Sequence, residues 1–351
     1  MALTRLTLTD FRNHAEFVCK PGNGFVILHG ANGAGKTNIL EAISLLVPGR
    51  GLRRAALSDM ARSGASGAFA ISAELGDVAI GTGTEPGKPE RRKVRINGAT
   101  ASANSLAQWL AIIWLTPAMD RLFADSAGAR RRFLDRLVLA LEPAHAMHSN
   151  RYELGLRQRN KLLTGDNAPD PAWLDAIEAE MAVSAVAITA SRNRVMAELS
   201  ARLKANPGGA FAVPVIAMDR LHEEDASQLS DIWRRGRGRD MAAGRTLIGP
   251  HRADLIVHHQ ASGHPAAHSS TGEQKALLLS IILAHAGLVA EQRGAPPILL
   301  LDEVAAHLDP ARRAALYEGL SFMGGQVWMT GTEASLFNGI DGGASIFEIG
   351  G

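Results

Sequence analysis

Residues 30–37 read Gly-Ala-Asn-Gly-Ala-Gly-Lys-Thr and satisfy the pattern G-x-x-x-x-G-K-[ST] in full. A short apolar stretch, residues 24–28 (GFVIL), precedes the pattern, and a helical pattern over residues 36–46 follows it. A strand, a glycine-rich turn and a helix in this order form the context in which such a loop cradles phosphate. An ordinary glycine-rich turn would not need these flanks, so the pattern predicts a phosphate-binding α/β unit.

Each residue type in the loop has a chemical role. Small residues let successive backbone N–H groups turn inward around a β-phosphate. The helix that begins near Lys36 directs the positive end of its dipole at the same anion. The Lys36 ammonium should reach the β- and γ-phosphates, and the Thr37 hydroxyl should ligate Mg²⁺. The predicted nucleotide-binding residues of this segment are Gly30, Ala31, Asn32, Gly33, Ala34, Gly35, Lys36, Thr37 and Asn38.

A second candidate site segment is the run Ile298-Leu-Leu-Leu-Asp302-Glu303, in which four apolar residues end in two carboxylates. A buried central strand delivers its carboxyl end to the ligand edge of an open α/β sheet. Asp302 is therefore expected to hold the coordination shell of Mg²⁺. Glu303 and Lys36 are the candidate catalytic residues. The Glu303 carboxylate can orient and polarise an attacking water.

Composition excludes several classes of protein. The 351 residues include 46% hydrophobic and 21% charged residues, which is enough apolar material for a sizeable core. The formal net charge is only +2, so a nucleic-acid site would have to be a local basic patch. The single cysteine, Cys19, excludes a disulfide within the chain. The start of the chain lacks the apolar core of a signal peptide, and the apolar run 276–290 predicts a buried helix, too short for a membrane span. We expect a cytoplasmic protein without a membrane partner.

The order of patterns along the chain predicts a head built from both ends. Alternating residues 4–9, 68–80 and 91–96 indicate strands, and residues 81–87 (GTGTEPG) indicate a hairpin loop. Residues 129–203 have helical periodicity, with a break at 164–171. We therefore predict an α/β head from residues 1–118 and 238–351, with an antiparallel N-terminal part in a mixed sheet, and a mainly helical lobe from residues 119–237.

The segment Ser269–Lys275 (SSTGEQK) precedes an apolar helix and lies between the two halves of the nucleotide site in sequence. That order resembles the ABC-type ATPases, whose signature motif reads Leu-Ser-Gly-Gly-Gln. The resemblance narrows to the RecF family of bacterial recombination-mediator ATPases, which are related to SMC-type heads. It is carried across essentially the whole chain by LTRLTLTDFRNHAEF, GANGAGKTNILEAI, RRRFLDRLV, GRTLIGPHRADL, STGEQKALLLS and LLLDEVAAHLD.

The resemblance implies an ABC-type ATPase head with a helical second lobe, and ATP with Mg²⁺ as cofactors. It implies that Ser270 and Gly272 of one subunit contact the γ-phosphate held by another, and that Arg12 and Asn13 lie near the nucleotide. It further implies ATP-dependent homodimerisation on DNA at gaps or single-strand/duplex junctions, slow DNA-stimulated hydrolysis that reopens the dimer, and roles in replication and repair. RecO and RecR are the implied partners in RecA loading and SOS induction. The chain departs from the general signature at Thr271 and Glu273, and it offers Thr330 or Thr332 where transporter ATPases place a histidine.

Local basic clusters exist despite the balanced total, at residues 53–54, 91–95, 130–136 and 234–239. Phosphate backbones reward such cations through counterion release, without sequence readout. The predicted DNA contacts are Arg130, Arg131, Arg132, Arg235 and Arg237. Each cluster has an alternative interpretation as a solvated charged face. Two alternative functions also stay open: a transporter's nucleotide-binding subunit, and a binding module whose nucleotide site is inactive.

Overall fold

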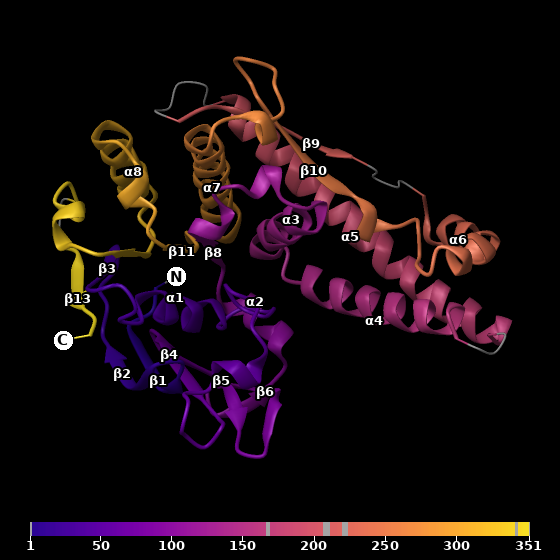
Figure 1. Ribbon diagram of the computed structural model, residues 1–351, viewed down its shortest axis with the longest axis horizontal. Coiled ribbons are helices and arrows are strands. Elements are labelled where there is room, and N and C mark those ends of the chain that lie inside the picture. The colour runs from indigo at the N-terminus through magenta and orange to yellow at the C-terminus, as the bar shows by residue number, and fades with distance from the viewer. Residues whose placement is uncertain (1, 166–168, 206–210, 220–223, 341–342, 351) are drawn as a thin grey trace. The chain divides into compact units, whose positions relative to one another are not determined.

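The computed structural model describes residues 2–165, 169–205, 211–219, 224–340 and 343–350. The chain divides into two compact units (Figure 1). Unit 1 holds residues 1–120 and 278–351 with the short segment 208–211, and unit 2 holds residues 121–207 and 212–277. The first boundary lies close to the predicted one. Residues 238–277, which the sequence pattern assigned to the head, are grouped with unit 2 in this division.

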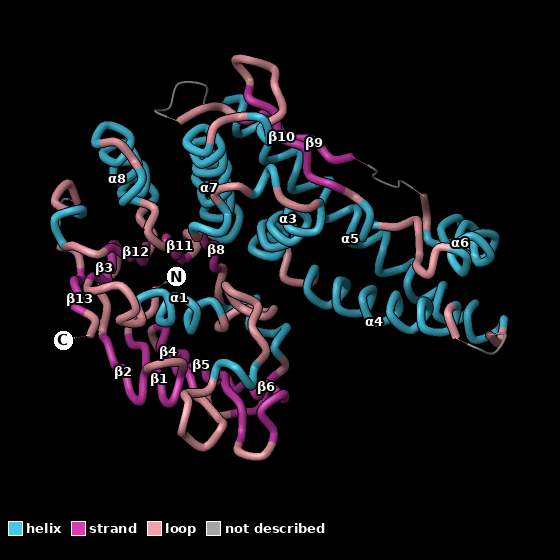
Figure 2. The backbone as a smooth tube through the Cα atoms, viewed as in Figure 1, coloured by secondary structure: helices cyan, strands magenta, loops and turns pink. Residues whose placement is uncertain are grey.

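Unit 1 contains an antiparallel sheet and a parallel sheet (Figure 2). The antiparallel sheet has the strand order β2-β1-β4-β5-β6-β7, with β1 Arg5–Phe11, β2 His14–Cys19, β4 Ala70–Leu75, β5 Val78–Glu85, β6 Lys88–Ile96 and β7 Ala99–Ala101. The parallel sheet has the order β13-β3-β12-β11-β8, with β3 Phe25–His29, β8 Ile112–Leu115, β11 Ile298–Leu301, β12 Val327–Gly331 and β13 Ser345–Glu348. The predicted α/β class with an antiparallel N-terminal part is what the structure shows.

Two details of the antiparallel sheet differ from the sequence prediction. Residues 68–80 form two strands rather than one, because the chain turns back at Gly76, whose φ of 57° lies in the left-handed region. The predicted loop 81–87 is strand as far as Glu85, and only its end makes the turn to β6. Gly83 allows this, because a Cβ there would lie 2.2 Å from the Phe69 carbonyl oxygen.

The parallel strands are apolar because helices cover them. The β11 residues Ile298–Leu301 are all buried, as expected for a parallel strand enclosed on both faces. Helix α1 (Lys36–Ser44) contacts both β1 and β12 and so lies between the two sheets. Figure 1 shows α7 (Thr271–Arg293) and α8 (Pro310–Met323) on the other side of the parallel sheet. The short helix α2 (Leu106–Trp109) leads into β8.

Helix α7 corresponds to the apolar run predicted from residues 276–290. Among the described helices it is the one with the length and composition to cross a membrane. However, 72% of its most apolar window is buried inside the structure, which is what the core helix of a folded domain requires. Its apolar residues are therefore accounted for by packing within the protein.

Within the described residues, unit 2 contains four complete α-helices, an antiparallel pair of strands and the start of α7. Its elements are α3 Ala127–Leu141, α4 His145–Leu163, α5 Pro171–Ala205, β9 Pro214–Asp219, α6 Ala226–Ala242 and β10 Asp254–His259. The pairing of β10 with β9 explains why residues after 238 belong to this unit. The run Pro-Gly-Gly at residues 207–209 predicts the end of the second long helix and lies outside the described residues.

The guanidinium of Arg159 on α4 is fully buried and joins three helices. It donates to Glu178 on α5 at 2.8 Å, to Asp240 on α6 at 2.7 Å and to the backbone carbonyl of Trp233 at 3.1 Å. A further bond reaches the Thr246 hydroxyl at 2.7 Å. Because this charge has no access to water, each of its bonds compensates for the hydration that folding removes.

The predicted family motif around residues 244–255 forms a second buried polar joint in unit 2. The His251 ring contacts the Tyr152 hydroxyl through Nδ1 at 2.6 Å and the Thr246 carbonyl through Nε2 at 2.9 Å. Since a carbonyl can only accept, Nε2 carries the hydrogen and Nδ1 accepts from tyrosine. Burial lowers the pKa of His251 to about 4, so the ring is neutral. Gly249 has a φ of 135°, and a Cβ there would meet the Tyr152 hydroxyl at 2.4 Å.

Replacement of Arg159 by alanine should lower the free energy of unfolding of unit 2 by about 3–5 kcal/mol, because the buried Asp240 would lose its cation and Glu178 would keep only Arg237. Chemical denaturation followed by tryptophan fluorescence measures this change. The matched control is Arg157→Ala on the same helix, where the side chain is 69% exposed and a change within about 0.5 kcal/mol is expected. Equal effects of the two substitutions would contradict the role given to Arg159.

Candidate functional site

The phosphate loop connects β3 to α1 in unit 1, as the sequence predicts. Gly30, Gly33 and Gly35 have φ values of 141°, 84° and 106°, which residues that carry a Cβ rarely adopt. Close packing adds a second requirement at two of these positions. A Cβ on Gly30 would lie 2.3 Å from the Ile349 carbonyl oxygen, and one on Gly35 would lie 2.6 Å from the side chains of Asn13 and His14. Glycine is therefore required by both backbone conformation and space.

Lys36 folds back over this loop. Its ammonium donates to the carbonyl oxygens of Gly30 at 2.6 Å and Ala31 at 2.9 Å, and the residue is only 5% exposed. The amine is thus held above the loop by the loop's own carbonyl groups. Helix α1 begins at the same residue, so its unpaired N-terminal N–H groups and the cation share one location. Both features favour an anion.

Asp302 follows β11 and connects three elements. Its Oδ1 accepts a hydrogen bond from the Thr37 hydroxyl on α1 at 2.9 Å and one from the Thr330 hydroxyl on β12 at 2.8 Å. Burial raises the pKa of this carboxyl, and the two hydroxyl groups act in the opposite direction. The sequence predicts that Thr37 and Asp302 both hold the metal, and in the structure a hydrogen bond joins these two side chains.

Glu303, the predicted water-orienting residue, has an unusual backbone. Its φ of 53° lies in the left-handed region, which costs a non-glycine residue on the order of 1 kcal/mol. Its N–H donates to the Thr330 hydroxyl at 2.8 Å. Thr330 is 1% exposed, and Thr332, two residues further on, is exposed. The two threonines considered in place of a transporter histidine are thus in different environments.

The turn between β1 and β2 lies over the phosphate loop. Asn13 donates to the Ala34 carbonyl at 3.0 Å and accepts from the Asn38 side chain at 2.7 Å. Next to it, Arg12 makes two bonds of 2.8 Å to Glu41 on α1. The Arg12 guanidinium is therefore held against α1 by a carboxylate rather than directed at the loop.

Glu41 was not singled out from the sequence. It is fully buried and also accepts from Arg53 at 3.0 Å, while Arg53 donates to Asn38 at 2.5 Å. One carboxylate thus anchors two arginines next to the nucleotide loop. A signal existed in the sequence, because Glu41 is the one charged residue in the mostly apolar run of residues 39–46.

Ser270 and Gly272 flank the first residue of α7, and both belong to unit 2. Ser270 is the residue before the helix. Its N–H and hydroxyl donate to the Glu273 carboxylate at 2.8 and 2.9 Å, and its Oγ accepts from the Glu273 N–H at 3.3 Å. This reciprocal arrangement is a capping box. Glu273, which stands where the general signature has glutamine, caps its own helix.

The predicted DNA-contacting arginines fall into two groups. Arg130 makes two bonds to Asp254, Arg131 donates to the Ala253 carbonyl, and Arg237 pairs with Asp175 and Glu178. These three side chains connect elements of unit 2. Arg132 and Arg235 are exposed, and within the described ranges neither has an acidic side chain as a partner.

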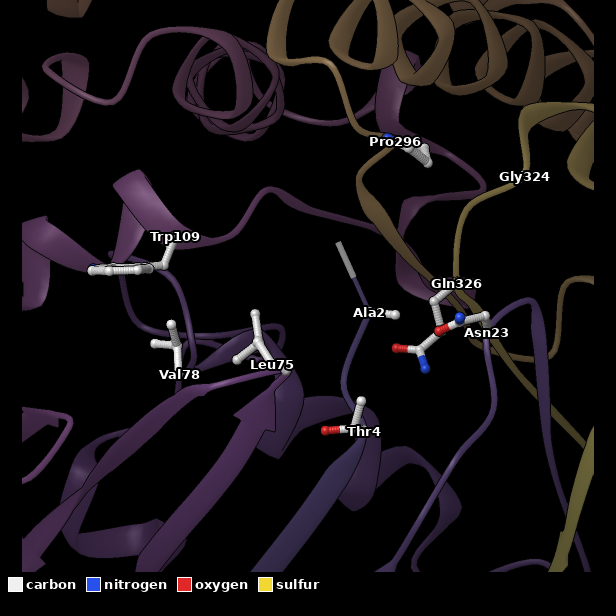
Figure 3. A pocket seen from close by; sticks show the side chains of 10 residues that line it. Ala2, Thr4, Asn23, Leu75, Val78, Trp109, Pro296, Gly324 and Gln326 are labelled. Carbon is white, nitrogen blue, oxygen red and sulfur yellow. The ribbon is translucent and has the colours of Figure 1, made fainter.

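A hollow of about 520 Å³ lies near the amino ends of the parallel strands, whereas the phosphate loop follows the carboxyl end of β3. Pro296 and Gln326, which precede β11 and β12, contribute to its lining. Figure 3 shows Trp109, Val78 and Leu75 on one side of it and Asn23 and Gln326 on the other. The side-chain amide of Gln326 is hydrogen-bonded to the backbone of Leu3: it accepts from the Leu3 N–H and donates to the Leu3 carbonyl. None of the predicted site residues lines this hollow.

The donor set of the predicted site fits a magnesium triphosphate. Mg²⁺ prefers oxygen ligands, and the Thr37 hydroxyl and the Asp302 carboxylate supply them within hydrogen-bond distance of each other. The three left-handed glycines and the start of α1 form a concave run of backbone N–H groups of the kind that binds phosphate. Lys36 supplies the remaining positive charge.

Comparison with known proteins identifies the family. The model of the RecF/RecN/SMC N-terminal domain matches residues 2–348. The DNA replication and repair proteins RecF of Brucella suis biovar 1 (strain 1330) and Mesorhizobium japonicum are each 50% identical to this chain, covering 99% of it and 94% and 96% of their own lengths. The fold matches that of the recombination mediator protein RecF-ATP in the RecFOR pathway, with a TM-score of 0.83, 23% identity and coverage of 99% of this chain and 95% of that one. A Smc head domain from Pyrococcus furiosus matches with a TM-score of 0.54 and 17% identity over 97% of this chain and 92% of that one. The chain therefore belongs to the RecF family of DNA replication and repair proteins, which share the head fold of ABC- and SMC-type ATPases.

Proposed function

We propose that this protein is a DNA-bound switch driven by the binding and hydrolysis of ATP. The observation that carries the proposal is the joint at Asp302, which brings the hydroxyl of the phosphate-loop helix and the backbone of Glu303 to one point. A protein that only needed a glycine-rich turn would require neither carboxylate. The RecF-ATP complex of similar fold supports ATP as the nucleotide.

In this proposal the residues of unit 1 divide the work on the nucleotide. The amides of Gly30–Gly35 and the Lys36 ammonium bind the β- and γ-phosphates. Thr37 and Asp302 would hold Mg²⁺, which when bound would neutralise part of the phosphate charge. Asn13, which is hydrogen-bonded to Asn38, holds the β1–β2 turn against the phosphate loop through its bond to the Ala34 carbonyl. Arg12 and Arg53 share the single carboxylate of Glu41, so this group keeps a net positive charge beside the loop.

Hydrolysis requires a water aligned with the γ-phosphate. Glu303 is the carboxylate that follows Asp302, and we assign it the role of accepting a proton from that water or orienting it. The general contribution of such a group is about 10²–10⁴-fold in rate, so turnover without it is slow but not zero. In the proposed cycle hydrolysis ends the ATP-bound state and reopens the dimer.

The dimer places the start of α7 from one copy on the γ-phosphate held by another. Ser270 and Gly272 lie at a helix N-terminus, where a phosphate is electrostatically favoured. For Ser270 to donate to that phosphate, its hydroxyl must leave the Glu273 carboxylate. We therefore expect closure of the dimer to include a local rearrangement of this cap.

DNA is the proposed macromolecular partner, as gapped duplex or single strands beside duplex. Arg132 and Arg235 are the best placed of the predicted contacts, because both are exposed on unit 2. Arg130, Arg131 and Arg237 have partners in the fold, so their contact with DNA stays a prediction. The RecFOR pathway named for the structurally similar RecF supports RecR and RecO as protein partners. RecA loading and SOS induction are the proposed outcome, which rests on the family resemblance alone. The cytoplasm is the matching compartment.

Glu303→Gln should trap the ATP-bound dimer. The amide keeps the size of the side chain but accepts no proton, so the rate of hydrolysis should fall by about 10²–10⁴-fold while ATP binding persists. Light scattering and size-exclusion chromatography with Mg²⁺-ATP measure the dimer fraction and its lifetime. The reference variant is Lys36→Ala, which should form no ATP-dependent dimer because the phosphates are left without their cation. A Glu303→Gln dimer with the wild-type lifetime would overturn the assigned role.

Removal of the exposed arginines should weaken DNA binding in a salt-dependent way. The slope of log K against log salt falls by about 0.9 for every DNA phosphate that the protein no longer neutralises, so Arg132→Gln with Arg235→Gln should reduce it by about twice that amount. Fluorescence anisotropy with a gapped duplex at several salt concentrations gives the slope. Arg157→Gln, also exposed on unit 2, is the control with no expected change. An unchanged slope in the double variant would exclude these two residues from the interface.

A further inference from the structure

Thr330 has no role in the proposed cycle, and the sequence offered it only, together with Thr332, where transporter ATPases place a histidine. It lies near the end of β12, between β3 and β11, and is 1% exposed. A buried hydroxyl in the interior of a sheet is costly unless its hydrogen-bonding capacity is used. Here both capacities are used, and both partners belong to the segment that carries the two functional carboxylates.

The directions of the two hydrogen bonds are fixed by chemistry. A backbone N–H can only donate, so the bond of 2.8 Å from Glu303 uses a lone pair of the Thr330 oxygen. The single hydroxyl hydrogen of Thr330 is then available for Asp302 Oδ1, also at 2.8 Å. One hydroxyl group therefore fixes the side chain of Asp302 and the backbone of Glu303 at the same time.

The backbone of Glu303 needs such a restraint. Its left-handed φ of 53° is a conformation that glutamate adopts only where neighbouring structure enforces it. Rotation out of this region would redirect the Cα–Cβ bond and with it the carboxylate. Asp302 has a second anchor in Thr37, whereas the Glu303 N–H is held by Thr330. The effect of Thr330 should therefore be larger on Glu303 than on Asp302.

We propose that Thr330 is a positioning residue, whose hydroxyl holds Glu303 in the left-handed conformation that aims its carboxylate for ATP hydrolysis. The inference rests on the proposed function, because it concerns the orientation of Glu303, to which that function assigns a part in hydrolysis. It predicts that removal of the hydroxyl slows the chemical step more than it weakens nucleotide binding, since the hydrogen bonds that hold Lys36 over the phosphate loop are made within that loop.

The first test needs no nucleotide. Hydrogen exchange of the Glu303 amide, followed by mass spectrometry with fragmentation, should show at least about tenfold faster exchange in Thr330→Val than in the wild type. Thr330→Ser, which retains the hydroxyl, should exchange at the wild-type rate. The amide of Leu300 in β11 serves as the internal reference, because faster exchange there would report general destabilisation of the sheet. Wild-type exchange at Glu303 in Thr330→Val overturns the proposal.

The second test separates positioning from folding. In steady-state ATPase assays, Thr330→Val should lower kcat by about ten- to a hundredfold while KM for ATP changes by less than about threefold. Thr330→Ser should restore kcat. Thr189→Val makes the same change at a buried threonine of α5 in unit 2 and should leave kcat unchanged.

The two tests fail in distinguishable ways. If Thr330→Ser is impaired as strongly as Thr330→Val although it keeps the hydroxyl, the hydroxyl does not set the rate and the proposal is overturned. A rise in KM without a fall in kcat would also overturn it. If the wild-type protein hydrolyses no ATP, the proposed function fails, and the exchange experiment still decides whether Thr330 restrains Glu303.

Discussion

The carboxylate of Asp302 is the point at which the nucleotide site is assembled. It receives hydroxyl groups from α1 and from β12, and it is itself carried by the end of β11. This arrangement is possible because β3, β12 and β11 are parallel neighbours, so their carboxyl ends emerge at one edge of the sheet. The phosphate loop, the acidic pair and Thr330 are therefore brought together by strand order. Each residue separately is ordinary, and the site arises from the register of the strands.

Sequence reasoning was reliable where the chemistry demands a fixed local pattern. The phosphate loop needs glycine at positions of positive φ and a lysine at the helix start, so the eight residues from Gly30 to Thr37 specify the local structure. The acidic pair after an apolar strand was recognisable for a similar reason. In each case the signal is contained in a few consecutive residues, and no knowledge of distant contacts is required.

The remainder of the site depends on contacts that no local pattern contains. Glu41 and Arg12 are separated in sequence, and only the fold shows that one neutralises the other. Thr330 appeared as a substitute for a transporter histidine, but its hydroxyl is directed at Asp302 and Glu303. The arginine clusters illustrate the same limit. Charge density predicted DNA contact for Arg130 and Arg237, yet ion pairs within unit 2 already use their side chains.

The order of strands in the parallel sheet also constrains how the protein can be made. Strand β3, which leads into the phosphate loop, is flanked by β12 and β13, and both come from residues after 326. During synthesis on the ribosome, the apolar strand near the N-terminus must wait until nearly the whole polypeptide has emerged before its neighbours exist. Such non-local pairing slows folding and prolongs exposure of apolar surface. Unit 2 is complete in the nascent chain well before that point, so it can fold while the nucleotide-binding half is still unfinished.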